Sequence, residues 1–181
     1  MRINSDVFAD WKQKMSVVNW LMMDFNFESL YIISKNIMWT LGPTDGLLKK
    51  LQAVQNAAAR VTTKTRKFDH ITPVLRKLHW LPVRKRIVYK LAVMVYKCLH
   101  GLAPPYLATD CVPVTSVASR RHLRSAASGC LAVTGTKTAL GRRNFAVSGA
   151  TIWNNLPTDL RLHSQSLLSF GQKLKQYLFE P

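Results

Sequence analysis

The residues from Phe68 to Ile87 combine an Asp-His pair, a second histidine and a run of basic residues, all of which are types that could do chemistry. Asp69 and His70 are adjacent and could act as a general base with its orienting carboxylate, and a second histidine, His79, follows. A catalytic triad also needs a nucleophile within hydrogen-bond reach of the base, and no serine here has the glycine pattern of a nucleophile elbow. We therefore interpret Asp69 and His70 as residues that order the turn before Thr72-Pro73.

Metal binding is a second chemistry to weigh, because zinc accepts cysteine and histidine ligands. The candidate ligands are Cys98, His100, Cys111 and His122. Structural zinc sites usually place two cysteines a few residues apart, and no pair here has that spacing. Converging carboxylates of a two-metal polymerase and glycine-rich phosphate loops are also absent. We predict no metal site, no cofactor and no enzymatic activity.

Charge is the most extreme property of the chain. It has 26 Lys and Arg residues against 9 Asp and Glu, a formal net charge of +17 over 181 residues. Such an excess repels itself in a compact state and is typical of proteins that bind a polyanion. Basic and acidic residues are equal in number in residues 1–40, so the whole excess follows Thr40. We predict a boundary near Leu41–Gly42–Pro43, between an N-terminal segment, 1–40, and a basic region, 41–181.

Nucleic-acid binding is the chemistry that this charge distribution favours. Eleven basic residues and one acidic residue lie between Arg60 and Lys97, and a second basic zone follows in predicted loops. Lysine and arginine bind phosphates through charge and donor geometry, which gives salt-dependent affinity with little sequence preference. Trp80 and Trp153 could stack on bases, although packing is the commoner role. The residues predicted to contact an RNA or DNA backbone are Arg66, Lys67, Arg84, Lys85, Arg86, Lys90, Arg120, Arg121, Arg142 and Arg143.

Hydrophobic periodicity predicts helices in the first part of the chain. Apolar residues of the N-terminal segment recur at spacings of three and four, which places them on one stripe of a helix. They are Phe8, Trp11, Met15, Val18, Met22 and Phe25. Another helix is predicted to start at Thr44 and to bury an apolar face with the same kind of spacing. That face consists of Leu47, Leu48, Leu51, Val54, Ala58 and Val61.

Two proline-marked steps follow in the sequence. Thr72-Pro73 predicts the start of a short helix, because threonine is a good cap and proline fits the first helical position. Leu81-Pro82 repeats the pattern and starts a longer helix. This helix is predicted to end at His100-Gly101, since glycine readily adopts the left-handed conformation that terminates helices.

The helical pattern weakens after Gly101. Residues 130–140 are β-prone around a glycine and could form a small hairpin, while residues 145–153 are ambiguous between helix and strand. Ser166 is predicted to cap a final amphipathic helix. The predicted fold class is mainly α: a small helical bundle with an irregular C-terminal part that can include a β-hairpin.

The cysteines and the apolar stretches indicate the compartment. Cys98, Cys111 and Cys130 are odd in number and widely spaced, which fits reduced thiols better than a disulfide framework. The start of the chain lacks the apolar core of a signal peptide. The most apolar stretch, residues 30–41, contains Lys35 and is shorter than the roughly 20 residues that span a bilayer. We expect an intracellular protein, of the nucleus or cytoplasm, with no membrane association.

Several sequence blocks after Leu41 form a specific series. The longest begins LLKKLQAVQNAAARV and continues through HWLPVRKRIVYKLAVMVYKCLHGLAPPYL. RRHLRSA, LGRRNFAVSGATIWNNLP, DLR and SFGQKLKQYLF follow in order. Together, over about residues 41–179, they resemble the C-terminal region of LINE-type, non-LTR retrotransposon reverse transcriptase polyproteins. None of these blocks is a catalytic motif.

The resemblance implies a tail that follows the polymerase domain and helps to hold template RNA or target DNA during target-primed reverse transcription. The polymerase carboxylates and the endonuclease of that family do not occur in this chain, and residues 1–40 match no part of the region. We expect a non-catalytic fragment that binds RNA or DNA backbone non-specifically. The alternative is a protein-interaction or scaffold remnant that packs on an upstream reverse transcriptase domain, through exposed Leu, Val and Met on the helix after Pro82.

Overall fold

The computed structural model describes residues 45–117, 128–138, 141–162 and 166–180. Within these ranges the chain forms seven α-helices and no β-strand, which confirms the mainly α prediction. The helices are α3 (Asp45–Thr63), α4 (Ile71–Lys77), α5 (Val83–Leu99), α6 (Pro105–Ala108), α7 (Phe145–Asn154), α8 (Thr158–Leu162) and α9 (Leu167–Phe179), with short 3-10 turns η1 (Val114–Ser116) and η3 (Gly141–Arg143). The helix predicted over residues 8–25, the Thr44 cap and the boundary near residues 41–43 lie outside the described ranges.

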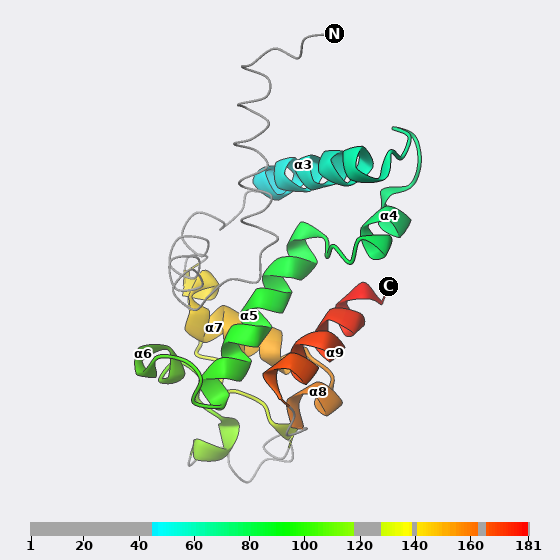
Figure 1. Ribbon diagram of the computed structural model, residues 1–181. Coiled ribbons are helices and arrows are strands. Elements are labelled where there is room, and N and C mark those ends of the chain that lie inside the picture. Colours follow the sequence, from blue (N-terminus) through cyan, green and yellow to red (C-terminus); the bar gives the residue numbers. More distant parts are fainter. Residues whose placement is uncertain (1–44, 118–127, 139–140, 163–165, 181) are drawn as a thin grey trace.

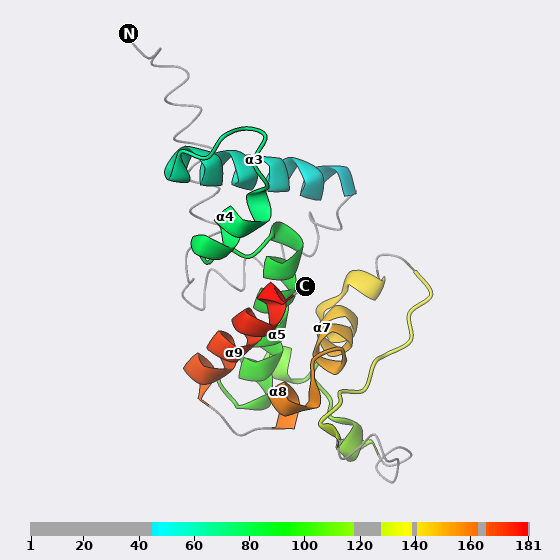
Figure 2. The ribbon, with the colours of Figure 1, turned by 90° about the vertical axis from the view of Figure 1, so that its right-hand side faces the viewer.

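Helix α5 is the centre of the arrangement. It packs against α7 and α9 along its length and against α6 near its C-terminal end. The α3–α4 hairpin lies across the N-terminal end of α5 (Figure 1), and the view in Figure 2 shows α3 crossing above the other helices. None of the helices in the described ranges has the length and apolar character needed to cross a membrane.

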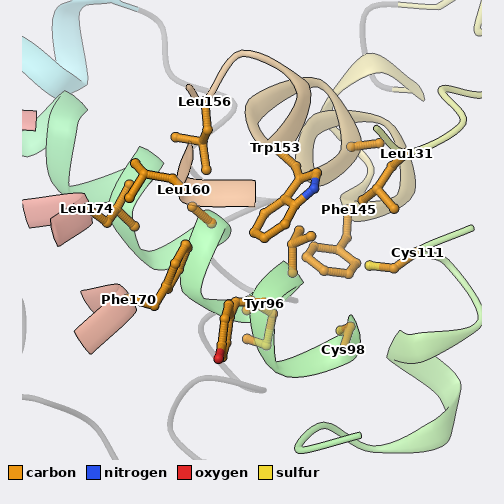
Figure 3. Packing of buried hydrophobic residues seen from close by; sticks show 14 of the residues in the cluster. Tyr96, Cys98, Cys111, Leu131, Phe145, Trp153, Leu156, Leu160, Phe170 and Leu174 are labelled. Atoms are coloured by element: carbon orange, nitrogen blue, oxygen red, sulfur yellow. The ribbon is translucent and has the colours of Figure 1, made fainter. Parts of the chain in front are cut away.

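Three aromatic rings fill the core between α5, α7 and α9 (Figure 3). Phe170 of α9 stacks on Tyr96 of α5 with 4.4 Å between ring centroids, and it lies 5.9 Å from the ring of Trp153 on α7. Trp153 is almost fully buried, and its Nε1 donates to the Gly129 carbonyl at 3.0 Å. Aromatic contacts of this kind add stability beyond the area that they bury. Trp153 is thus a core residue and cannot stack on a base.

Residues 128–138 are held to α7 by Asn154 and do not fold into a hairpin. Leu131 N donates to Asn154 Oδ1 at 2.8 Å, and Asn154 Nδ2 donates to the Leu131 carbonyl at 2.9 Å. Leu131 also forms an isolated antiparallel bridge with Pro113. Because these backbone groups pair with distant parts of the chain, no hairpin forms within the described residues 130–138, and that prediction is wrong. The ambiguous residues 145–153 are helical, as part of α7.

Three helices end in the same backbone motif, with one residue in the left-handed region. These residues are Lys64 (φ 54°), His79 (φ 54°) and Gly101 (φ 68°). After α4, His79 N donates to the Arg76 carbonyl and Trp80 N donates to the Leu75 carbonyl, which is the Schellman pattern. The predicted end of α5 at His100-Gly101 is confirmed. The other two helices end without glycine, so the turns after α3 and α4 are strained.

The helix starts follow the prediction less closely. Helix α4 begins at Ile71 with His70 as N-cap, and α5 begins at Val83 with Pro82 as N-cap. The expected caps at Thr72 and Leu81 were therefore wrong by one or two positions. Ser166 caps α9 as predicted, with its side chain accepting from Ser169 N at 3.2 Å.

The buried face of α3 differs from the prediction. Leu48, Gln55 and Ala59 are buried, whereas Leu47, Val54 and Val61 are exposed. The cause is a pair of polar contacts with the turn between α4 and α5. Proline offers no polar side chain to cap α5, and Val83 N donates instead to Gln52 Oε1 at 2.8 Å.

The second of these contacts is buried. Gln55 Nε2 donates to the Leu81 carbonyl at 2.8 Å. A buried carbonyl left without a donor costs about 1–3 kcal/mol, so the two glutamines decide which side of α3 faces α5.

Replacing His79 with glycine is expected to stabilise the protein by up to about 1 kcal/mol. The left-handed conformation costs a side-chain-bearing residue roughly 1–2 kcal/mol, more than the extra chain entropy of glycine. Urea unfolding should show a higher midpoint with an unchanged slope. Gly101→Ala is the opposite change at the matching position after α5 and should lower the midpoint. Equal midpoints for the two variants would contradict the claim that the left-handed conformation at His79 is strained.

Gln55→Ala is expected to destabilise the protein by about 1–3 kcal/mol, because the Leu81 carbonyl loses its donor in a buried position. The measurement is again the free energy of unfolding in urea. Gln172 on α9 is exposed and provides the control, since Gln172→Ala should have little effect. Similar losses for the two variants would show that Gln55 does not anchor α3.

Candidate nucleic-acid interface

The structure brings part of the predicted interface together at the α3–α4 end of the bundle. Arg66 and Lys67 lie in the loop between α3 and α4, residues 64–70, which we call the basic loop. Arg84, Lys85, Arg86 and Lys90 lie on the first half of α5. Arg142 lies on η3, which packs on α7 away from the basic loop in both views (Figures 1 and 2). Arg120 and Arg121 fall outside the described residues, as does the side chain of Arg143.

The basic loop is folded by its own backbone. Asp69 N donates to the Arg66 carbonyl at 3.2 Å, and Arg66 N donates to Asp69 Oδ2 at 3.2 Å, which closes a tight turn. Arg60 on α3 adds a donor to the Asp69 carbonyl at 3.3 Å. The single acidic side chain of the loop is thus turned towards the backbone, which confirms that Asp69 orders the turn.

The cationic side chains of the basic loop point into solvent. Lys64, Arg66 and Lys67 are all exposed. Among the described residues, none of the three side chains takes part in an ion pair or hydrogen bond. A phosphate could therefore bind these three side chains without displacing a partner within the described chain. The side chains remain hydrated in the free protein.

Phe68 is a feature of this loop that sequence reasoning missed. Its side chain is 93% exposed, directly after Lys67. An exposed ring between charged residues is suited to stacking on an unpaired base. The signal was present in the sequence, as one aromatic residue within a short run of charged ones. The two tryptophans considered instead are core or half-buried residues.

The basic residues at the start of α5 are engaged inside the protein. Arg84 pairs with the Asp45 carboxylate at the start of α3, although both side chains remain more than half exposed. Lys85 Nζ donates to the Glu180 carbonyl at 2.9 Å, after the end of α9. Exposed ion pairs contribute little stability. These contacts nevertheless mean that a phosphate must compete for Arg84 and Lys85.

Lys85 acts together with a residue outside the predicted set. The Arg76 guanidinium on α4 donates to the Phe179 carbonyl at 2.9 Å. Cations near the last carbonyls of a helix are favourable, because the C-terminal end of the helix dipole is negative. Arg76 and Lys85 therefore hold α9 to the α4–α5 corner. Arg86 and Lys90, further along α5, are half-buried.

The catalytic and metal-binding hypotheses gain no geometric support in the described residues. Asp69 pairs with a backbone N–H, and His79 occupies the end of α4, so the two serve the turns that contain them. His100 stacks on Tyr96 with 3.9 Å between ring centroids. Within residues 45–117, 128–138, 141–162 and 166–180, no group of three or more potential ligands among His, Cys, Asp and Glu lies close enough to hold a metal ion.

Two of the three cysteines lie together in the core (Figure 3). Cys98 and Cys111 are both buried and share a hydrogen bond, which raises the pKa of the Cys111 thiol and lowers the pKa of Cys98. Burial adds to the rise at Cys111. Cys130 is half-buried, and its sulfur accepts from Arg161 at 2.7 Å. The expectation of reduced thiols is consistent with this structure, in which all three are free cysteines.

Comparison of the chain with protein-family models, with curated proteins and with solved structures finds no match. The site is therefore interpreted from its own geometry and charge.

Alkylation should distinguish the three thiols. Iodoacetamide is expected to modify Cys130 first and to reach Cys98 and Cys111 only when the protein unfolds, because exposure controls access to the sulfur. Mass spectrometry of timed samples, with and without urea, measures the order. Modification of Cys98 or Cys111 as fast as Cys130 in native buffer would contradict the packing of α5 against the Cys111 segment.

Proposed function

We propose that this protein is a non-catalytic nucleic-acid-binding module that holds RNA or DNA backbone non-specifically, with the basic loop as its main contact surface. It is proposed to act like the tail of the LINE-type reverse transcriptases that its sequence resembles. The observation that carries the proposal is the set of exposed cations at Lys64, Arg66 and Lys67, none of them engaged within the described chain.

Physical arguments favour the loop over the rest of the basic surface. A cation that already bonds a carbonyl or carboxylate gains less from a phosphate, because the old contact is lost when the new one forms. Arg84 and Lys85 are in that position, and with Arg76 they add to the local positive potential rather than to the direct contacts. Phe68 extends the same surface with an apolar ring.

The packing of α5 favours nucleic-acid binding over the scaffold alternative, in which α5 contacts an upstream reverse transcriptase domain. That alternative needed exposed apolar residues on α5, but Val83, Met94 and Val95 are buried and form the core with α7 and α9. The burial of these α5 residues supports the nucleic-acid proposal over the scaffold alternative.

The proposal predicts a change in salt dependence. Each phosphate contact on duplex DNA contributes about 0.9 to the slope of log K against log salt concentration. Arg66→Ala combined with Lys67→Ala should therefore reduce the slope by about 2. Binding of the full chain to a short duplex is measured by fluorescence anisotropy over a salt series.

A matched control removes the same charge elsewhere. Lys49 and Lys50 are exposed on the first turns of α3, about 20 Å along the helix from the basic loop. Lys49→Ala with Lys50→Ala should change the slope much less. Equal reductions in the two variants would mean a diffuse positive surface and would sink the assignment to the loop.

Phe68→Ala tests the stacking part of the proposal. Loss of one stacked base weakens binding to single-stranded RNA by about 1–3 kcal/mol, while the salt slope should stay the same because no phosphate contact is lost. Duplex binding should be unaffected, since paired bases are not accessible to the ring. Equal affinity of Phe68→Ala and the unaltered protein for single strands would remove Phe68 from the interface.

A further inference from the structure

Helix α3 has a second apolar face that the described chain does not cover. Leu47, Val54 and Val61 are 38%, 37% and 59% exposed, and they are spaced seven residues apart. Leu51 and Ala58, both half-buried, lie between them at steps of four and three. We call these five residues the α3 stripe. Alternation of three and four is the pattern by which one helix packs along another.

The α3 stripe is not needed to attach α3 to the rest of the fold. Attachment is through Gln52, Gln55 and their neighbours Leu48 and Ala59, which lie about a quarter turn further round the helix. Such an exposed apolar row on a helix that already has a buried face indicates an interaction surface.

The residues that precede α3 carry a complementary pattern. Phe8, Trp11, Met15, Val18, Met22 and Phe25 are spaced by three and four in strict alternation. All but Val18 have bulky side chains, whereas those of the α3 stripe are small or branched, and alternating large and small side chains across an interface allows close packing. The two rows belong to one chain, and the 19 residues from 26 to 44 connect Phe25 to the start of α3 at Asp45.

Charge also favours this occupant. Lys50 is exposed beside the α3 stripe, whereas Lys49 lies on the opposite side of the helix. Residues 8–25 carry two acidic residues, Asp10 and Asp24, and two basic ones, Lys12 and Lys14, so this segment brings no net charge to the α3 stripe. Pairing of two α3 helices would instead bring like charges together, which disfavours a second copy as the occupant.

We propose that residues 8–25 form a helix that docks along the α3 stripe of the same chain, and thereby covers Leu47, Val54 and Val61. This contact is independent of nucleic-acid binding, because the basic loop lies beyond the C-terminal end of α3. It gives residues 1–40 a role as an intramolecular partner of the basic region.

Hydrogen exchange of the full chain, read by mass spectrometry, tests the docking. Backbone amides of residues 8–25 should be protected in the unaltered protein. Val54→Asp places a charge in the docked face and should reduce their protection by about tenfold or more, while the amides of α5 and α9 stay as they were. Met15→Asp should also reduce the protection of residues 8–25. Because Met15 lies outside the described residues, this change does not alter the packing of the described helices.

Ala53→Asp is the matched control, since Ala53 is exposed on the side of α3 away from the stripe and its change should leave residues 8–25 protected. Exchange of residues 8–25 at the unfolded rate in the unaltered protein would overturn the proposal. So would protection that disappears on dilution together with a dimer mass in light scattering, because the stripe would then bind a second copy.

Discussion

The pairing of two glutamine side chains of α3 with the backbone between α4 and α5 is the contact on which the rest of the arrangement depends. Gln55 satisfies the Leu81 carbonyl and Gln52 satisfies Val83 N, at a corner where proline leaves α5 without a side-chain cap. Buried backbone groups must find partners, so these bonds fix the rotation of α3 about its own axis. That rotation turns Leu47, Val54 and Val61 outwards.

The same corner explains why so few of the many basic residues are suited to binding. Arg76 bonds the last carbonyl of α9, Lys85 bonds the carbonyl of Glu180 directly after it, and Arg84 pairs with Asp45. The positive charge at the α3–α4 end therefore has two uses: some cations join the helices, and those of the basic loop remain exposed. Asp69 closes the loop through its backbone, so the one acidic residue there shapes the surface that displays Arg66 and Lys67.

Local signals in the sequence were enough to predict helices α3, α4, α5 and α9, but not α6, α7 or α8. The periodicity after Thr44, the glycine after His100 and the serine cap before α9 each act over a few residues, and each prediction matches the described structure. The buried side of α3 could not be predicted in this way, because its hydrophobic stripe is real but faces outwards. Two glutamines outcompete it through hydrogen bonds to residues about thirty positions away. Likewise the β-prone residues after Cys130 pair with Pro113 and Asn154 instead of each other.

For the site, the charge distribution predicted a polyanionic partner and included Arg66 and Lys67 in a set of ten contact residues, but it could not separate exposed cations from engaged ones. That distinction depends on contacts such as Lys85 with the Glu180 carbonyl, which join residues far apart in the chain. Phe68 was missed because its exposure follows from the loop geometry and not from its residue type.

The most direct test of the proposed nucleic-acid binding at the basic loop is lysine footprinting of the full chain, in which acetylation of each lysine is measured with and without single-stranded RNA at low salt. Binding at the basic loop predicts strong protection of Lys64 and Lys67, with Lys49, Lys50 and Lys173 modified as readily as before. Uniform protection, or protection confined to lysines away from residues 64–70, would contradict the account.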